Sequence, residues 1–218
     1  MEKPNGILPS QHIHALMRGG ALMTKGDLAD GQVQPASLDL RLGDVAYRVR
    51  ASFMPGPGVP VRDKLERLKL HEVDLTQGAV LETGCVYIVP LLEHLDLPDD
   101  IAASANPKSS TGRLDIFTRV MADGAQEFDK VPAGYCGPLY LEVSPRTFPI
   151  VARKGSRLSQ IRFRKGHAVL NATALEALHE REKLTFGGQP LIANGALSLS
   201  IDLNAHQGVL LGYRGKRH

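Results

Sequence analysis

The chain contains few cysteines, little net charge and no long apolar run. Cys85 and Cys136 are the only cysteines in 218 residues, too few for a disulfide-bonded scaffold, which favours a reducing, cytoplasmic location. The net charge of +3 is too small to indicate a nucleic-acid partner. No apolar stretch approaches the roughly 20 residues that span a membrane, and the N-terminus lacks the apolar core of a signal peptide. The sequence therefore predicts a cytoplasmic protein without nucleic-acid or membrane partners.

Motifs of several common enzyme classes are also missing. Zinc-dependent nucleobase deaminases need a Pro-Cys-x-x-Cys segment, whereas the two cysteines here lie far apart. His179 and Glu180 begin like the zinc motif His-Glu-x-x-His, but Lys183 stands where the second histidine is required. The sequence has no Walker motif, no dinucleotide-binding glycine pattern and no Gly-x-Ser-x-Gly elbow. These absences argue against zinc chemistry, P-loop chemistry and an α/β-hydrolase.

Frequent turn residues indicate a mainly β protein. The chain has 22 glycines and 14 prolines, and its apolar runs are short, as in folds of many strands joined by turns. Helices are predicted for Ser10 to Leu22, with Ser10 as N-cap and Gly19-Gly20 stopping the helical spacing, and for Thr173 to Leu184, with Leu175, Ala177 and Leu178 facing inward. Leu38 to Leu42 alternates apolar and charged residues, the pattern of a half-buried strand. Further strands are predicted at Cys85–Leu91, Ile101–Ser104, Ile116–Met121, Leu139–Val143, Ile150–Arg153 and Leu158–Phe163.

One short polar segment is suited to binding phosphate. Lys108, Ser109, Ser110, Thr111, Gly112 and Arg113 follow one another directly. Two cations, three hydroxyls and a glycine within six residues supply many donors for phosphate oxygens. The alternative interpretation is a solvated surface turn after Asn106-Pro107.

A second segment carries a carboxylate where an apolar residue is expected. A turn at Gly134 leads into an apolar strand that contains Glu142. Successive side chains of a strand point to opposite faces, so Leu139, Leu141 and Val143 share one face and Tyr140, Glu142 and Ser144 share the other. Glu142 is therefore a candidate general base that acts on a water molecule. The alternative is a glutamate on an edge strand that faces solvent.

Five segments, in this order along the chain, resemble the dCTP deaminase branch of the dUTPase-like superfamily. Gln34 to Gly43 is similar to the family's Gln-Pro-Ala-Ser-x-Asp-x-Arg-Leu-Gly signature, and Lys108 to Arg113 to its Arg-Ser-Ser-x-x-Arg phosphate motif. Phe128 to Gly137 resembles its Ile-Asp-Pro-Gly-Trp-x-Gly turn with two extra residues. Leu141-Glu142 falls where the family has its catalytic Leu-Glu, and Gly155 to Phe163 resembles the closing strand shared with dUTPases.

The resemblance implies a fold, an assembly and a reaction. The fold would be a dUTPase-like distorted jelly roll or β-barrel, with a short N-terminal helix and one C-terminal helix. The protein would form a homotrimer with active sites between subunits and would convert dCTP and water into dUTP and ammonia. Glu142 would be catalytic, Mg²⁺ would accompany the triphosphate, and no zinc would be needed. The implied substrate-binding residues are Lys108, Ser109, Ser110, Thr111, Gly112, Arg113, Asp129, Tyr135, Tyr140 and Leu141.

Several side chains keep two interpretations. Asp129 either accepts a hydrogen bond from the deoxyribose 3′-hydroxyl or caps a turn. Tyr135 either lines the sugar or base pocket or packs within the turn. Asp39 and Arg41 alternate with leucines, so they form either a buried or intersubunit ion pair or a ligand contact.

The chain also departs from the family pattern. Gln126-Glu127 stands where the family usually has His-Arg, whose arginine helps to orient catalytic groups. A C-terminal lid is matched only by Thr185 to Pro190. We expect a catalytic domain at residues 1–165 and an extension at 166–218. Ser200 to Leu203, followed by Tyr213-Arg214, loosely repeats the pattern of Ser37 to Leu40 followed by Tyr47-Arg48. This similarity suggests the start of a second repeat in a longer protein.

Two alternative functions follow from the same residues. A dUTPase would direct water at the α-phosphorus of dUTP rather than at the base, although Leu141-Glu142 fits a deaminase better. A degenerate nucleotide-binding or scaffold module is favoured by Glu127 and by the weak match to the lid.

Overall fold

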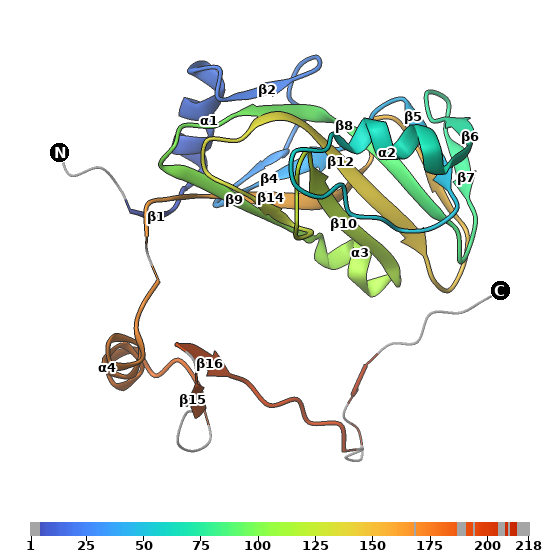
Figure 1. The fold of residues 1–218 in the computed structure, drawn as a ribbon. Helices are drawn as coiled ribbons and strands as arrows, with labels where there is room; N and C mark the ends of the chain where they lie inside the picture. The colour runs from blue at the N-terminus through green and yellow to red at the C-terminus, as the bar shows by residue number, and fades with distance from the viewer. Residues whose placement is uncertain are drawn as a thin grey trace. The chain divides into compact units, whose positions relative to one another are not determined.

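The structure is a computed structural model that describes residues 5–167, 169–186, 191–193, 195–204, 208 and 210–212. It divides into two compact units, the first extending to Gly166 and the second beginning at His167. Each unit is described by itself. The first contains two six-stranded sheets (Figure 1).

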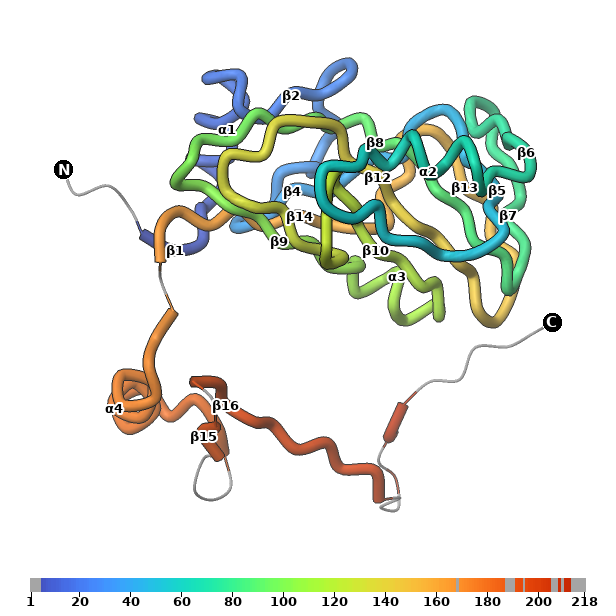
Figure 2. The backbone as a smooth tube through the Cα atoms, viewed as in Figure 1, coloured from blue at the N-terminus to red at the C-terminus, as the bar shows by residue number. Residues whose placement is uncertain are grey.

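One strand of the first sheet leads into the segment suited to binding phosphate, Lys108 to Arg113, which is called the phosphate-like segment below. Its order is β11-β9-β14-β4-β3, and β1 also pairs with β14. In Figure 2 the backbones of β9, β14 and β4 follow one another closely. β9 leads directly into the segment that begins at Lys108. The bounds of these strands are β1 Gly6–Ile7, β3 Val33–Gln34, β4 Ser37–Arg41, β9 Ile101–Pro107, β11 Lys130–Val131 and β14 Arg157–Lys165.

The second sheet carries the candidate general base. Its order is β10-β12-β8-β5-β6, and β2 also pairs with β8. All strand pairings of both sheets are antiparallel among the described residues. Its strands are β2 Leu22–Thr24, β5 Val45–Val49, β6 Lys69–Asp74, β8 Val86–Asp96, β10 Ile116–Ala122 and β12 Cys136–Pro145; β7 Ala79–Leu81 and β13 Ile150–Ala152 form a separate pair.

Two apolar clusters stabilise this unit. The larger cluster includes Leu40, Leu139, Leu141 and Phe163, which come from both sheets and are fully buried. The smaller cluster lies on the other face of the second sheet, where Val61 and Leu65 of α2 pack against strand residues. β12 therefore has apolar neighbours on both faces, and a carboxylate on it is removed from water. The prediction of a mainly β fold is confirmed.

The helices differ from the sequence predictions. α1 covers Ser10–Arg18 and ends at Gly19-Gly20, the predicted stop, so it does not extend to Leu22, which begins β2. Pro9, not Ser10, is its N-cap. Helix α2 (Val61–Leu68) was not predicted, although Asp123 Oδ1 accepts the Val61 N–H at 2.7 Å and so supports its first turn. The segment suited to binding phosphate forms a short helix, α3 (Ser109–Arg113), for which no secondary structure was predicted.

Strand β4 also differs, because it is buried on both faces. Asp39 and Arg41 are buried together with the leucines beside them. The prediction of a half-buried strand is therefore wrong: alternation showed which side chains share a face but could not show that both faces are covered.

The second unit contains helix α4 (Ala172–Glu182) and a hairpin of β15 (Leu191–Ala193) and β16 (Ala196–Ser198). No residue of α4 is buried, so the prediction of an inward apolar face is wrong. None of the helices described is long and apolar enough to cross a membrane.

Two predictions concern residues near the end of the chain. Ser200 to Leu203 forms no strand, in contrast to the earlier segment that it resembles. Gly187 to Pro190 of the lid match and Tyr213-Arg214 lie outside the described residues. A second repeat stays a prediction.

Candidate functional site

Glu142 lies in the middle of β12 and is 1% exposed. Leu141 and Val143 belong to the core between the sheets, whereas Tyr140 belongs to the cluster under α2. The predicted alternation of β12 is confirmed, and Glu142 lies on the side of α2. The alternative of a solvent-facing glutamate is wrong. A carboxylate buried to this degree needs a paired charge or hydrogen bonds.

Arg119 of β10 supplies that charge. It lies directly opposite Glu142 in the β10–β12 register. Its Nη2 and Nε donate to the same oxygen, Oε1, at 2.7 and 3.1 Å. The other oxygen, Oε2, is buried and has no hydrogen-bond partner among the described residues. Oε2 of Glu142 is therefore a buried carboxylate oxygen that the ion pair with Arg119 does not engage.

Three neighbours hold the Arg119 guanidinium. Phe128 lies 3.6 Å from it, measured from Cζ to the ring centroid, and Phe117 lies at 4.9 Å. Nη2 also donates to Ser52 Oγ at 2.7 Å. Arginine is favoured over aromatic faces because the ring quadrupole attracts its charge. Sequence reasoning missed Arg119, and the one available signal was a lone cation within the apolar run from Ile116 to Met121.

Asp129 lies in the turn directly after Phe128 and has a positive φ of 60°. Its Oδ1 accepts the Val120 N–H at 2.8 Å, and its own N–H donates to Val120 O at 2.9 Å. Burial raises the pKa of Asp129; the charge of Glu142 adds to this increase and the charge of Arg119 opposes it. These contacts support the turn-capping interpretation and place Asp129 within electrostatic range of the Arg119–Glu142 pair.

The phosphate-like segment is largely open. Ser109, Ser110, Gly112 and Arg113 are exposed, whereas Thr111 is buried. Among the described residues, no hydrogen bond or ion pair engages the side chains of Ser109, Ser110 or Arg113. These donors are therefore free to bind an anion.

Lys108 differs from the rest of its motif because it is already paired. Its Nζ forms an ion pair with Asp39, whose side chain is 2% exposed. Arg157 lies 3.7 Å from the same Asp39 oxygen. Lys108 thus joins α3 to strand β4, and much of its charge is neutralised before any ligand arrives.

Arg41 also forms a buried pair within this chain. Its Nε donates to Glu93 Oε1 at 2.8 Å, and its backbone N–H donates to Glu93 Oε2 at 2.8 Å. Of the interpretations left open for Asp39 and Arg41, the structure therefore favours buried ion pairs within one subunit.

The remaining predicted site residues lie inside the protein. The Tyr135 hydroxyl donates to Pro138 O at 2.6 Å and accepts the Asp123 N–H at 3.0 Å, which supports packing within the turn. Burial raises the pKa of Tyr135. The Leu141 side chain lies in the core between the sheets and cannot contact a ligand from there. Tyr140 borders a cavity of about 440 Å³ beside α2.

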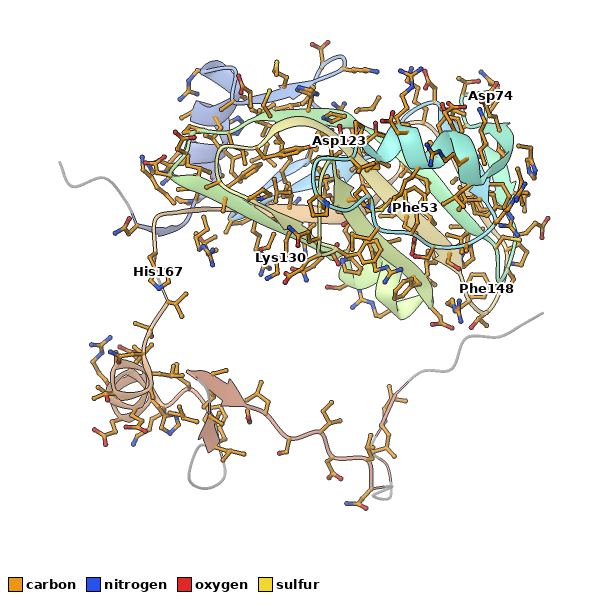
Figure 3. All side chains as sticks on the ribbon, in the orientation of Figure 1. Phe53, Asp74, Asp123, Lys130, Phe148 and His167 are labelled. Atoms are coloured by element: carbon orange, nitrogen blue, oxygen red, sulfur yellow. The ribbon has the colours of Figure 1, made fainter. Side chains whose placement is uncertain are left out.

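A cavity of about 640 Å³ lies in the first unit. It is bordered by β9, by β11 and by the loop from Asp123 to Glu127; Figure 3 labels Asp123 of this loop and Lys130 of β11. Gln126 and Glu127, the departure from the family pattern, belong to its wall. Neither of these two cavities contains Glu142 or a residue of α3.

Comparison with known proteins identifies the family. Residues 4–167 match the model of the 2′-deoxycytidine 5′-triphosphate deaminase (DCD) N-terminal domain. The chain belongs to this family. The resemblance read from the motifs is confirmed, and Glu142, Arg119 and α3 all lie within the matched deaminase domain.

Two curated relatives and a solved structure agree with this assignment. Proteins named dCTP deaminase, dUMP-forming, from Beutenbergia cavernae and Dictyoglomus thermophilum are 34% and 31% identical; the alignments cover 62% and 73% of this chain and 67% and 80% of theirs. A crystal structure of 2′-deoxycytidine 5′-triphosphate deaminase from Agrobacterium tumefaciens is 66% identical with a TM-score of 0.85. That match covers 94% of this chain, which spans 61% of the solved chain.

Among the described residues, no group of three or more histidines, cysteines, aspartates and glutamates could hold a metal ion.

Proposed function

We propose that this protein catalyses the hydrolytic deamination of dCTP to dUTP and ammonia. Membership of the deaminase family and the 66% identity to a solved deaminase support the reaction. The observation that carries the residue assignment is the buried Glu142, which has one oxygen bound to Arg119 and one without a hydrogen-bond partner in the part of the chain that the structure describes.

In this proposal Glu142 is the general base. It takes a proton from a water molecule as the water oxygen bonds to C4 of cytosine, and it passes this proton to N3. It then takes the proton of the new hydroxyl group on C4 and passes it to the amino group, so that the carbon–nitrogen bond breaks, a carbonyl forms at C4 and ammonia leaves. Such acid–base catalysis typically contributes about 10² to 10⁴ in rate. Mg²⁺ enters with the triphosphate, and the proposal needs no zinc.

The triphosphate would bind to Ser109, Ser110 and Arg113, whose side chains are exposed and unengaged. The guanidinium of Arg113 offers two parallel donors to phosphate oxygens. In this proposal a second subunit completes the active site, as the homotrimer requires. The trimer and the cytoplasmic location remain predictions.

A second candidate function is the formation of dUMP from dCTP. The two curated relatives described above carry dUMP-forming in their names. This reaction adds hydrolysis at the α-phosphorus to deamination, with release of pyrophosphate.

Product analysis tests these proposals. The protein is incubated with dCTP, and separately with dUTP, in the presence of Mg²⁺; ammonia, pyrophosphate and the nucleotide products are measured. Ammonia and dUTP from dCTP, lost in Glu142→Gln, are expected. Ammonia together with dUMP and pyrophosphate would establish the second candidate. Pyrophosphate from dUTP without ammonia from dCTP would indicate a dUTPase, and nucleotide binding without any product would indicate a degenerate module.

A further inference from the structure

The Arg119–Glu142 pair is asymmetric in a way that bears on catalysis. Both donating nitrogens of Arg119 go to Oε1 at 2.7 and 3.1 Å, whereas a fork-to-fork pair would engage both carboxylate oxygens. Oε2 is left buried without a partner among the described residues. A buried acceptor without a partner is unfavourable and usually marks a site that a water molecule, ion or ligand completes.

We propose that Arg119 is a positioning residue that fixes Oε2 of Glu142 as the proton-accepting atom. This inference rests on the proposed deamination, because it assigns atoms within the same site. By holding Oε1, Arg119 prevents the carboxylate from rotating about its terminal torsion, a broad torsion in a free glutamate. The base then presents one oxygen in one orientation to the attacking water.

Arg119 is itself held from several directions. β10 fixes its backbone opposite Glu142, the Phe128 ring lies against the guanidinium, and Ser52 accepts a hydrogen bond from Nη2. Groups held by several contacts before the substrate binds favour catalysis, because they need little reorganisation during the reaction. Phe128 also directly precedes Asp129, so the turn that Asp129 caps contains a direct contact with the guanidinium that orients the base.

Another role for Arg119 would be phosphate binding. Its side chain is 27% exposed, so the guanidinium is mostly enclosed. Two of its nitrogens already bind the carboxylate and Ser52. The exposed, unpaired Arg113 is better placed for an anion. A positioning role predicts a loss in kcat, whereas phosphate binding predicts a rise in KM.

The test compares Arg119→Met, Arg119→Lys and the double variant Arg119→Met/Glu142→Gln in the full-length protein. In Arg119→Met we expect kcat for ammonia release from dCTP to fall by about 100-fold, with KM changed by less than about 3-fold. Arg119→Lys should recover about 10-fold of this loss, because a lysine keeps the charge but cannot donate from two nitrogens of a planar group. In the Glu142→Gln background, removal of Arg119 should cost no further activity, because the two residues act as a unit.

Two controls separate positioning from folding and from loss of charge. The matched variant Arg67→Met removes an exposed arginine of α2 and should leave kcat and KM unchanged. Thermal unfolding is followed for each variant. If Arg119→Met unfolds, Arg119→Lys decides the question: a folded lysine variant with reduced kcat supports positioning, and one with unchanged kcat overturns it.

The remaining outcomes are also decisive. A kcat for Arg119→Met within about 3-fold of the unaltered protein overturns the inference, as does a further loss of similar size in the Glu142→Gln background. Ammonia release by the unaltered protein shows that the proposed function stands even when the inference fails. If the unaltered protein releases no ammonia from dCTP, the proposed function fails and the inference falls with it.

Discussion

Glu142 and the α3 segment differ in how they are held before any ligand binds. Glu142 is buried, lies on a central strand and is paired with Arg119. Ser109, Ser110 and Arg113 are exposed and unengaged. The reacting group is therefore fixed by the fold itself, whereas the phosphate donors gain partners only when a nucleotide arrives. We therefore expect substitutions at Glu142 to change mainly kcat, and substitutions in α3 to change mainly the affinity for the nucleotide.

The strongest test of this division is Glu142→Gln. The amide keeps the shape of the side chain but is a very poor base, so kcat should fall by about 10² to 10⁴. The dissociation constant for dCTP, measured by calorimetry, should stay within about 3-fold of its original value. The matched control Glu66→Gln, on an exposed position of α2, should change neither. A large loss of affinity in Glu142→Gln would contradict the division.

Arg113→Met should show the opposite behaviour. Loss of a bidentate, charge-assisted contact to phosphate costs about 1.5 to 3 kcal/mol. We therefore expect KM for dCTP to rise by roughly 10- to 100-fold, with kcat changed far less. Steady-state kinetics on Arg113→Met and on Arg113→Lys give the comparison, and the lysine variant should recover part of the affinity. A fall in kcat with unchanged KM would place Arg113 with the reacting groups instead.

Lys108 is expected to stabilise the fold rather than to bind phosphate. Its partner Asp39 is buried, but Lys108 is partly exposed and Arg157 stays near Asp39. Lys108→Met should therefore lower the free energy of unfolding by about 1 to 2 kcal/mol. Denaturant unfolding measures this change. The control Lys154→Met removes an exposed pair with Asp44 and should change stability by less than about 0.5 kcal/mol. A large rise in KM without a loss of stability would return Lys108 to the phosphate site.

The smallest effect should come from Asp129→Asn, as a dependence of stability on pH. Burial raises the pKa of Asp129, so the folded protein holds this proton more tightly than the unfolded chain. Its contribution to stability is present at low pH and is lost as the pH rises through the raised pKa. Asparagine does not titrate and can still accept the Val120 N–H. The melting temperature of the variant relative to the original should therefore rise between about pH 4 and about pH 7.

Asp74→Asn gives the opposite sign and serves as the control. Hydrogen bonds from the Thr76 N–H and hydroxyl lower the pKa of Asp74, an exposed residue labelled in Figure 3. Its contribution to stability is present above the ordinary pKa and is lost as the pH falls. The relative melting temperature of Asp74→Asn should therefore fall as the pH rises. The same slope for both variants would show that the effect does not arise from these carboxylates.

The local parts of the site could be predicted from the sequence. Strict alternation from Leu139 to Ser144 correctly gave the two faces of β12, because a strand repeats every two residues. The resemblance of Lys108 to Arg113 to a phosphate motif, together with the other motifs, indicated the family from the residues alone. Helix α2 was not predicted because it directly follows the proline- and glycine-rich loop from Met54 to Pro60. The helical pattern after this loop is short and is hard to separate from the irregular region.

The cation beside Glu142 could not be found in this way. The sequence suggested that the site loses a positive charge at Gln126-Glu127, but Arg119, from a different strand, pairs with Glu142. That pairing depends on the register between β10 and β12, and a shift of one residue would move Arg119 to the other face of the sheet. Register between strands joined by a long loop is set by packing and not by the local residue pattern.

The sequence by itself determined the family, the mainly β architecture and the identity of the candidate base, since motif order and period-two patterns are properties of the chain alone. Only the tertiary structure decided which charges meet: Lys108 with Asp39, Arg41 with Glu93 and Arg119 with Glu142. These pairs join residues far apart in the chain, and burial makes each partner necessary, because an unpaired charge inside the protein is strongly unfavourable. The same burial leaves Oε2 of Glu142 as the free oxygen of the pair.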